Sequence, residues 1–227
     1  RSSDLVCGRP QCESAGVQMV ENVLPWEQMK LRMLNGSHSF LAYLGYLAGF
    51  QHISDCMQDS AFREAAYRLM LTEQAPTLQI TDVDLNQYAL SLLDRFANPA
   101  LKHKTWQIAM DGSQKLPQRM LEGIRVHLAR QSEWPLLALG IAGWMRYVSG
   151  VDDSGATIDI RDPLCEKIAA LVAQSTESER VSALLSLHEI FSADLVQNPQ
   201  FVAVIQQAWQ RIAQYGAHQA VIETLKN

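Results

Sequence analysis

The chain has 227 residues, 48% of them hydrophobic and 7% aromatic, and a formal net charge of −5. This length is enough for one or two domains with a sizeable buried core, and the ordinary apolar content with modest charge argues against a disordered chain. The excess of 24 acidic over 19 basic residues argues against a broad nucleic-acid-binding surface. Four scattered cysteines do not form a disulfide framework, which predicts a reduced, cytoplasmic protein.

One stretch without charged residues, 33–54, is long enough to cross a bilayer. Its hydrophobicity is interrupted by polar side chains such as Asn35, His38 and His52. A second apolar run, 135–145, is too short to span a membrane. We therefore predict two buried helices at these positions and no membrane span.

Helical periodicity dominates the sequence, because apolar residues recur three or four positions apart. The pattern predicts helices over 26–49, 61–74, 81–96, 117–131, 134–148, 163–173, 178–191 and 199–225. Thr81-Asp82 is expected to cap the third helix, Asn98-Pro99 to end it, and Gly216 to break the last helix.

Strand signals are weak, and the two candidates, 78–83 and 157–160, are short and isolated. The turn-rich segment 150–159 is predicted to be a loop. Residues 1–16 have the composition of a connector, and the chain opens on Arg1 rather than on Met. We expect an all-α domain with a single core over residues 17–227, preceded by a connector that leaves an earlier part of a longer protein.

Common cofactor and metal motifs are absent from the sequence. There is no Gly-x-Gly-x-x-Gly after a strand, no phosphate loop and no His-Glu-x-x-His pair. Cys7 and Cys12 are at the wide edge of zinc-ligand spacing and have no second pair of ligands nearby. The sequence therefore predicts no metal site.

The first long helix carries an unusual polar group: Glu27, Lys30, Asn35 and His38 fall within an arc of roughly 140°, whereas Arg32 points elsewhere. A lysine that is partly buried among apolar neighbours has a lowered pKa and can exchange a proton with an alcohol or carbonyl. The amide can donate to the reacting oxygen, the imidazole can hold a neighbouring hydroxyl, and Glu27 can refill the lysine's proton. The alternative is a surface ion pair between Glu27 and Lys30 beside buried structural polar groups.

A second group of polar residues surrounds Asn98-Pro99 and includes cations in predicted loops. Such cations can hold hydroxyls or a carboxylate, although the same residues also fit helix ends and turns. The group consists of Arg95, Lys102, His103, Lys104, Asp111 and Lys115.

Together these motifs resemble the polyol-specific long-chain dehydrogenase family. The resemblance covers essentially the whole chain and is sharpest in five segments: 8–17, Pro25-Trp26-Glu27-x2-Lys30-x4-Asn35-x2-His38, 43–49, Arg95-Phe96-x-Asn98-Pro99 and Asp111-Gly112-Ser113-x-Lys115. It implies a metal-independent, NAD- or NADP-dependent enzyme with an N-terminal Rossmann domain and an all-α C-terminal domain of the 6-phosphogluconate dehydrogenase C-terminal type. The Rossmann half is not in this chain, so a preference between NAD and NADP cannot be read from it.

The resemblance also implies roles for single residues. Lys30 would be the general acid/base, Asn35 would polarise the reacting oxygen, and His38 would position the substrate. Lys115 is a further candidate substrate contact, and we add Arg95 and Glu27 to the binding group. The partner of the chain would be its own N-terminal domain, and no nucleic acid or membrane partner is expected.

Two substrate classes and one non-enzymatic function stay open. D-mannonate and D-fructuronate are favoured because Lys102, His103, Lys104, Lys115 or Arg119 could supply a cation for a carboxylate. Mannitol or arabinitol is the alternative. A non-catalytic helical interaction module is the alternative of another class.

Overall fold

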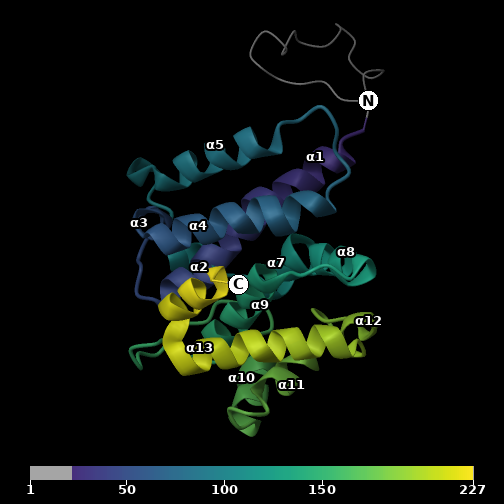
Figure 1. The fold of residues 1–227 in the computed structure, drawn as a ribbon. Helices are drawn as coiled ribbons and strands as arrows, with labels where there is room; N and C mark the ends of the chain where they lie inside the picture. The colour runs from purple at the N-terminus through teal and green to yellow at the C-terminus, as the bar shows by residue number, and fades with distance from the viewer. Residues whose placement is uncertain (1–21, 227) are drawn as a thin grey trace, which may run out of the picture.

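The computed structural model describes residues 22–226, and its backbone is built from helices joined by short turns (Figure 1). Within this range there are no strands, only two isolated β-bridges, His52–Lys104 and Val151–Thr157. The all-α prediction is therefore confirmed, and neither candidate strand forms. The predicted connector 1–16, with Cys7 and Cys12, lies outside the described residues.

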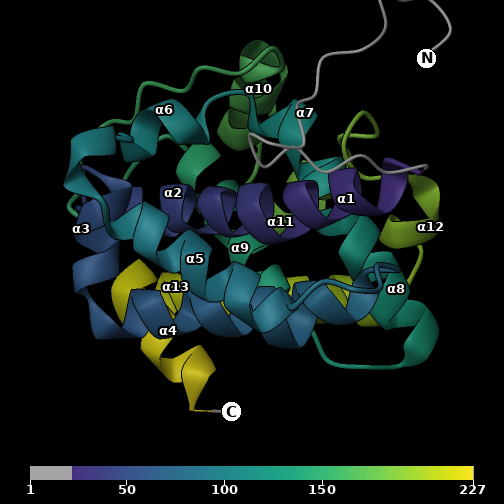
Figure 2. The same cartoon turned by 90° about the horizontal axis from the view of Figure 1, so that it is seen from above.

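The predicted first helix is a column of three consecutive segments, α1 Leu24–Met29, η3 Lys30–Gly36 and α2 Ser37–Leu47. Seen from above, α1 and α2 lie end to end along one line (Figure 2). The middle segment, η3, is a π-helix, in which backbone hydrogen bonds run from residue i to i+5. The column holds the helical prediction over 26–49 almost to its last residue, and Gly49 ends it with φ of 89°.

The second group of helices packs beside this column. It consists of α3 Ile53–Gln58, α4 Ser60–Arg68, η4 Leu69–Gln74, η5 Ala75–Thr77 and α5 Leu85–Ala97. The predicted cap of α5 is wrong by two residues: Asp84 caps the helix by accepting a hydrogen bond from the Gln87 amide at 2.9 Å. Asp82 instead adopts a left-handed conformation with φ of 62°, which turns the chain before the helix begins. Asn98 ends α5 as predicted.

The third group supplies the centre of the molecule. It runs through η6 Pro99–Leu101, α6 Thr105–Ala109, α7 Gly112–Leu116, η7 Pro117–Leu121, α8 Glu122–Arg130 and α9 Pro135–Val148. Helix α9 contacts both α2 and α13 Pro199–Leu225, and these three helices bury much of the aromatic core. Tyr43, Trp144 and Trp209 are among its large, almost fully buried side chains.

The last group covers the lower side of the molecule in Figure 1, with α10 Cys165–Gln174, α11 Arg180–Leu185 and α12 Ala193–Val196 before α13. The helix predicted over 178–191 is shorter than expected, since α11 ends at Leu185. The predicted break in the last helix is confirmed: Gly216 has φ of 75° and ψ of 166°. The Ala217 amide after it donates to the Asp153 carboxylate at 2.6 Å.

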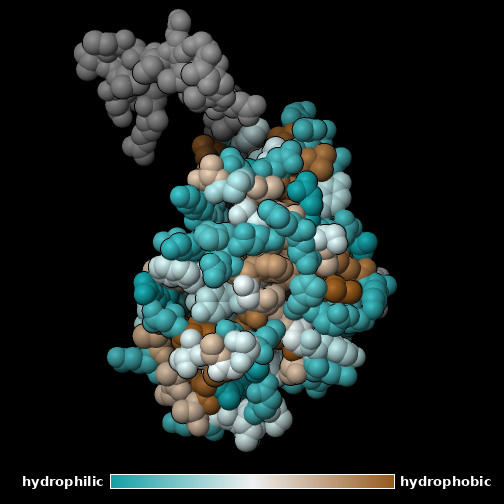
Figure 3. All heavy atoms as spheres, turned by 90° about the vertical axis from the view of Figure 1, so that its left-hand side faces the viewer, coloured by the Kyte–Doolittle hydropathy of each residue, from teal (hydrophilic) through white to brown (hydrophobic). Residues whose placement is uncertain are grey.

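Among residues 22–226, no helix combines the length and the apolar character that a bilayer span requires. The side of the molecule shown in Figure 3 is mostly polar, and its hydrophobic atoms lie in small groups between polar ones. The large hydrophobic side chains exposed in the described range are Val23, Leu24, Leu90, Leu101, Val151 and Tyr215.

Candidate active site

Lys30, Asn35 and His38 lie on the α1–η3–α2 column, as predicted, and the π-helical turn changes their relative orientation. In a regular α-helix, residues five positions apart are rotated by about 140° from one another. A π-helix places roughly one more residue in each turn. Lys30 and Asn35, which are the first and sixth residues of η3, therefore lie nearer to one face than α-helical spacing predicts.

Two residues fix the opposite side of η3. Arg32 points away from the candidate residues, as predicted, and is buried, where its guanidinium donates to the Thr77 carbonyl at 2.8 Å and to the Thr77 hydroxyl at 2.9 Å. Gly36 permits close packing, because an added Cβ would lie 2.8 Å from Gln74 Nε2 and 2.9 Å from the Arg119 carbonyl oxygen. The column is thereby held directly against η5, η4 and η7.

Three π-helical segments, η3, η4 and η7, meet at this place, and η3 contacts both of the others. Gln74 at the end of η4 donates to the Arg119 carbonyl of η7 at 2.9 Å. Short π segments inside α-helices occur frequently at functional sites. No pattern in the sequence predicted them, because the apolar spacing of a short π turn is close to that of an α-helix.

His38 is the most enclosed of the three candidate residues. Its ring stacks on Phe96 of α5, with centroids 4.9 Å apart and planes inclined by 16°. It also contacts the ring of His103, with centroids 5.2 Å apart and planes inclined by 57°. Nε2 of His38 is buried and has no hydrogen-bond partner among the described residues.

The surroundings of His38 disfavour its protonated form. Burial is the main cause, and the nearby His103, Arg119, Arg95 and Lys115 add to it, so that the pKa of His38 falls to about 3. The imidazole is therefore neutral near pH 7 and has one donor and one acceptor nitrogen. Such a ring can orient a hydroxyl, but it is not a source of protons at that pH.

Two of the cations near His38 are held by backbone carbonyls. Arg119 donates to the Ser39 hydroxyl at 3.0 Å and to the Asn35 carbonyl at 3.5 Å, and burial lowers the pKa of its guanidinium. Lys115 donates to the carbonyls of Ile108, at 3.2 Å, and Met110. Burial and the charge of Arg119 lower the pKa of Lys115, as a lysine poised in a site requires.

Other predicted residues are placed differently. Lys30 and Glu27 are exposed, and no ion pair joins them within residues 22–226, so the expected partial burial of Lys30 is not provided by the described residues. Arg95 is exposed, yet its charge acts on His38. Lys102 and Lys104 are exposed, and neither is among the charges that shift the pKa of His38.

Lys104 instead lines a separate cavity of about 300 Å³, together with Tyr46, His52 and Trp106. The sequence indicated Arg119 and His103 only as candidate cations for a carboxylate. It did not predict that Arg119 packs against the backbone of the candidate helix, or that Phe96 and His103 contact His38. These contacts join positions 58 to 84 residues apart, and local spacing carries no signal for them.

In 22–226, no group of three or more His, Cys, Asp or Glu side chains is arranged to hold a metal ion. The described residues also do not form a dinucleotide-binding fold by themselves, because this range contains no strand that leads through a glycine-rich turn into a helix.

Comparison with known proteins connects this geometry to a family. The family model described as "Mannitol dehydrogenase C-terminal domain" matches residues 22–213. An uncharacterised oxidoreductase of Escherichia coli K12 (YeiQ) is 73% identical over 98% of this chain and 46% of its own length. The D-mannonate oxidoreductase of the same organism is 52% identical over 96% of this chain and 45% of its own length.

A solved structure shows the same architecture. Mannitol 2-dehydrogenase of Pseudomonas fluorescens, in a ternary complex with NAD and D-mannitol, superimposes with a TM-score of 0.89 at 34% identity, over 98% of this chain and 45% of that chain. The chain thus spans a little under half the length of the relatives it matches. With its helical fold, its Lys30–Asn35–His38 column and its match to the C-terminal family model, the chain belongs to the mannitol dehydrogenase family.

Proposed function

We propose that the full-length protein is an NAD- or NADP-dependent oxidoreductase that interconverts a linear sugar acid or polyol and the corresponding keto sugar. Residues 17–227 would be its all-α substrate domain, and residues 1–16 would connect this domain to an N-terminal Rossmann domain. The proposal is supported by family membership and by the neutral, cation-surrounded His38 beside Lys30 and Asn35.

In the proposed reaction, Lys30 exchanges a proton with the oxygen at the reacting carbon. Asn35 donates a hydrogen bond to the same oxygen and stabilises the negative charge that develops there. His38, as a neutral imidazole, holds a neighbouring hydroxyl, and Glu27 lies one turn from Lys30, where it can return a proton to it. The nicotinamide, held by the part of the protein outside this chain, would supply or accept the hydride.

We propose a sugar acid, D-mannonate or D-fructuronate, as the preferred substrate. The observation that carries this choice is the set of positive charges that acts on His38, namely Arg95, Lys115 and Arg119, since a carboxylate would be stabilised there. The 52% identity to the D-mannonate oxidoreductase of Escherichia coli agrees with it.

A neutral polyol is the second candidate. It is favoured by the ternary complex of the similar mannitol 2-dehydrogenase, whose substrate is D-mannitol. The same three cations can also donate hydrogen bonds to hydroxyl groups, so mannitol or arabinitol fits the same residues.

A panel assay of the full-length protein separates these candidates. D-fructuronate, D-tagaturonate, fructose and xylulose would each be reduced with NADH and with NADPH, and kcat/KM compared. The sugar-acid proposal predicts the highest kcat/KM for a ketouronate, and a clear preference for fructose or xylulose would contradict it. Turnover of none of the four substrates with either cofactor would contradict the proposed activity itself.

A further inference from the structure

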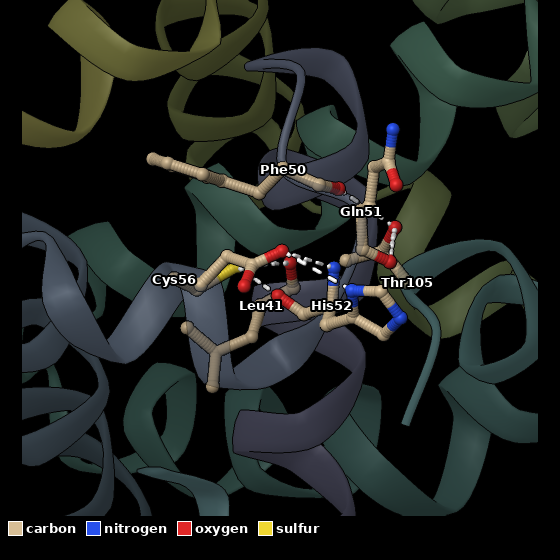
Figure 4. A network of polar contacts seen from close by, with 7 residues as sticks. Leu41, Phe50, Gln51, His52, Cys56 and Thr105 are labelled. Carbon is tan, nitrogen blue, oxygen red and sulfur yellow. Dashed lines mark hydrogen bonds and ion pairs between the residues drawn. The ribbon is translucent and has the colours of Figure 1, made fainter. Parts of the chain in front are cut away.

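His103 has a fixed backbone and a ring that faces the candidate site. Its carbonyl accepts a hydrogen bond from the Ile53 amide at 2.9 Å, and the Thr105 amide donates to the Gln51 carbonyl at 3.0 Å. The next residue, Lys104, forms the bridge with His52. Figure 4 shows the neighbouring contacts, in which the Thr105 side chain reaches back to the Phe50 and Gln51 carbonyls.

This frame determines what the His103 ring can contact. The backbone on both sides of His103 is tied to the connection between α2 and α3, and α2 is the helix that carries His38. Both rings are therefore held relative to α2, His38 directly and His103 through the connection that follows the helix. This arrangement keeps the two ring centroids 5.2 Å apart.

One ring nitrogen of His38 is buried without a hydrogen-bond partner among the described residues. This nitrogen is Nε2, and a buried polar atom without a partner destabilises the structure. Of the two rings that contact His38, Phe96 has no polar atom, whereas His103 has two ring nitrogens that can donate or accept. No hydrogen bond joins these two described residues, so His103 acts on His38 by ring packing.

We infer that His103 is a positioning residue of this site, whose imidazole packs against the His38 ring and holds it against Phe96 for its contact with the substrate. The inference rests on the proposed function, because it assigns His38 a substrate to orient. His103 also lowers the pKa of His38, and only burial has a larger effect. The His38 imidazole is therefore expected to stay neutral during turnover near pH 7.

The test uses the full-length protein with D-fructuronate and NADH, or the best substrate of the panel. His103→Ala removes the ring and its nitrogens, His103→Phe keeps a ring without nitrogens, and His103→Gln keeps an amide donor and acceptor. We expect His103→Ala and His103→Gln, which both lack the ring, to raise the KM for the sugar by roughly 10- to 100-fold, as misplaced contacts do, with an unchanged KM for NADH. His103→Phe should stay near the parent KM, because it keeps a ring against His38. His188→Phe, at an exposed histidine on another surface, is the matched control and should leave both values unchanged.

A double-variant comparison guards against a purely structural effect. If His103 acts through His38, then His38→Ala with His103→Ala should be about as impaired as His38→Ala alone, since the second change has nothing left to misplace. Losses that multiply in the double variant, or a fully active His103→Ala, would overturn the inference. If His38→Ala and Lys30→Ala both retain full turnover, the proposed function fails instead, so the two failures are distinguishable.

Discussion

Lys30, Asn35 and His38 differ in how strongly the rest of the described protein determines them. His38 is enclosed by Phe96, His103 and several cations, and Asn35 is fixed through its carbonyl by Arg119. Lys30 is exposed and has no such support among residues 22–226. The substrate-orienting part of the proposed site is therefore formed by this chain, whereas the environment of its proton-transfer residue is not completed by it.

Replacement of Lys30 by Ala tests the proton-transfer role. We expect kcat of the full-length protein to fall by roughly 10²- to 10⁴-fold, because positioned acid/base catalysis is typically worth that much. Lys167→Ala, at another exposed lysine, is the control and should stay near the parent activity. Steady-state kinetics at several pH values would check this, and turnover of Lys30→Ala within tenfold of the parent would show that the assignment is wrong.

At the level of elements, the π-helical segment η3 depends on what lies behind it. Gly36 ends η3 and meets Gln74 and the Arg119 carbonyl, so the position of Asn35 and His38 follows from the contact between η3, η4 and η7. A single carbon atom at Gly36 would have to displace backbone as well as a side chain.

Replacement of Gly36 by Ala tests this dependence. The added Cβ would lie 2.9 Å from a backbone oxygen, and overpacking of this kind typically costs about 1–3 kcal/mol. We expect a lower thermal midpoint and a raised KM for the sugar in the full-length protein. Gln87→Ala, at an exposed position of α5, should change neither quantity. An unchanged KM in Gly36→Ala would mean that the column does not need this close packing.

Glu73 of η4 gives a second prediction at the level of elements. Its buried carboxyl accepts hydrogen bonds from the amides of Leu136 and Leu137, at 2.8 and 2.7 Å, at the start of α9. Burial raises the pKa of Glu73 to about 8, although these two hydrogen bonds act in the opposite direction. The folded protein then holds this proton more tightly than the unfolded chain, whose glutamate titrates near 4.3.

A carboxyl with a raised folded pKa contributes stability below its unfolded pKa and loses it as the pH rises through the folded value. We expect the thermal midpoint to decline between pH 5 and pH 8 and this slope to be smaller in Glu73→Gln. Glu133→Gln, at an exposed glutamate, is the control and should keep the parent slope. Equal slopes in all three proteins would contradict the raised pKa.

Across the whole molecule, sequence patterns predict some parts of the fold and miss others. Long amphipathic stretches predicted the main helices and the break at Gly216, because many residues contribute to each signal. Helix α3 was not predicted, since its six residues are too few for a periodic pattern. The cap of α5 was misplaced because Thr81, Asp82 and Asp84 all have capping side chains, and only the left-handed turn at Asp82 decides among them.

The candidate site was predictable only along the helix. The Lys30–Asn35–His38 spacing and Lys115 were read from motifs. The π turn, the stacking of Phe96 and the contact of His103 arise from packing between segments far apart in the sequence. Burial was expected for Lys30 because the surrounding stretch is apolar, but a helix has two sides and Lys30 lies on the exposed one.

At the scale of the whole molecule, a prediction concerns the activity of this chain without the rest of the protein. If another part of the full-length protein binds the cofactor, then the 227-residue chain alone should show no NADH oxidation with D-fructuronate. A spectrophotometric assay would check this, with the full-length protein as the positive control. Measurable oxidation by the separate chain would contradict the proposed two-part active site.

The position of α2 in the core has a consequence for synthesis on the ribosome. The uncharged stretch that includes α2 packs mainly against α9 and α6, and both follow later in the chain. About 100 residues must be added before α9 is complete, which takes roughly 5–20 s at usual elongation rates. During that interval an apolar segment lacks its final partner, so nascent chains that stall before α9 are expected to be the ones most in need of chaperones.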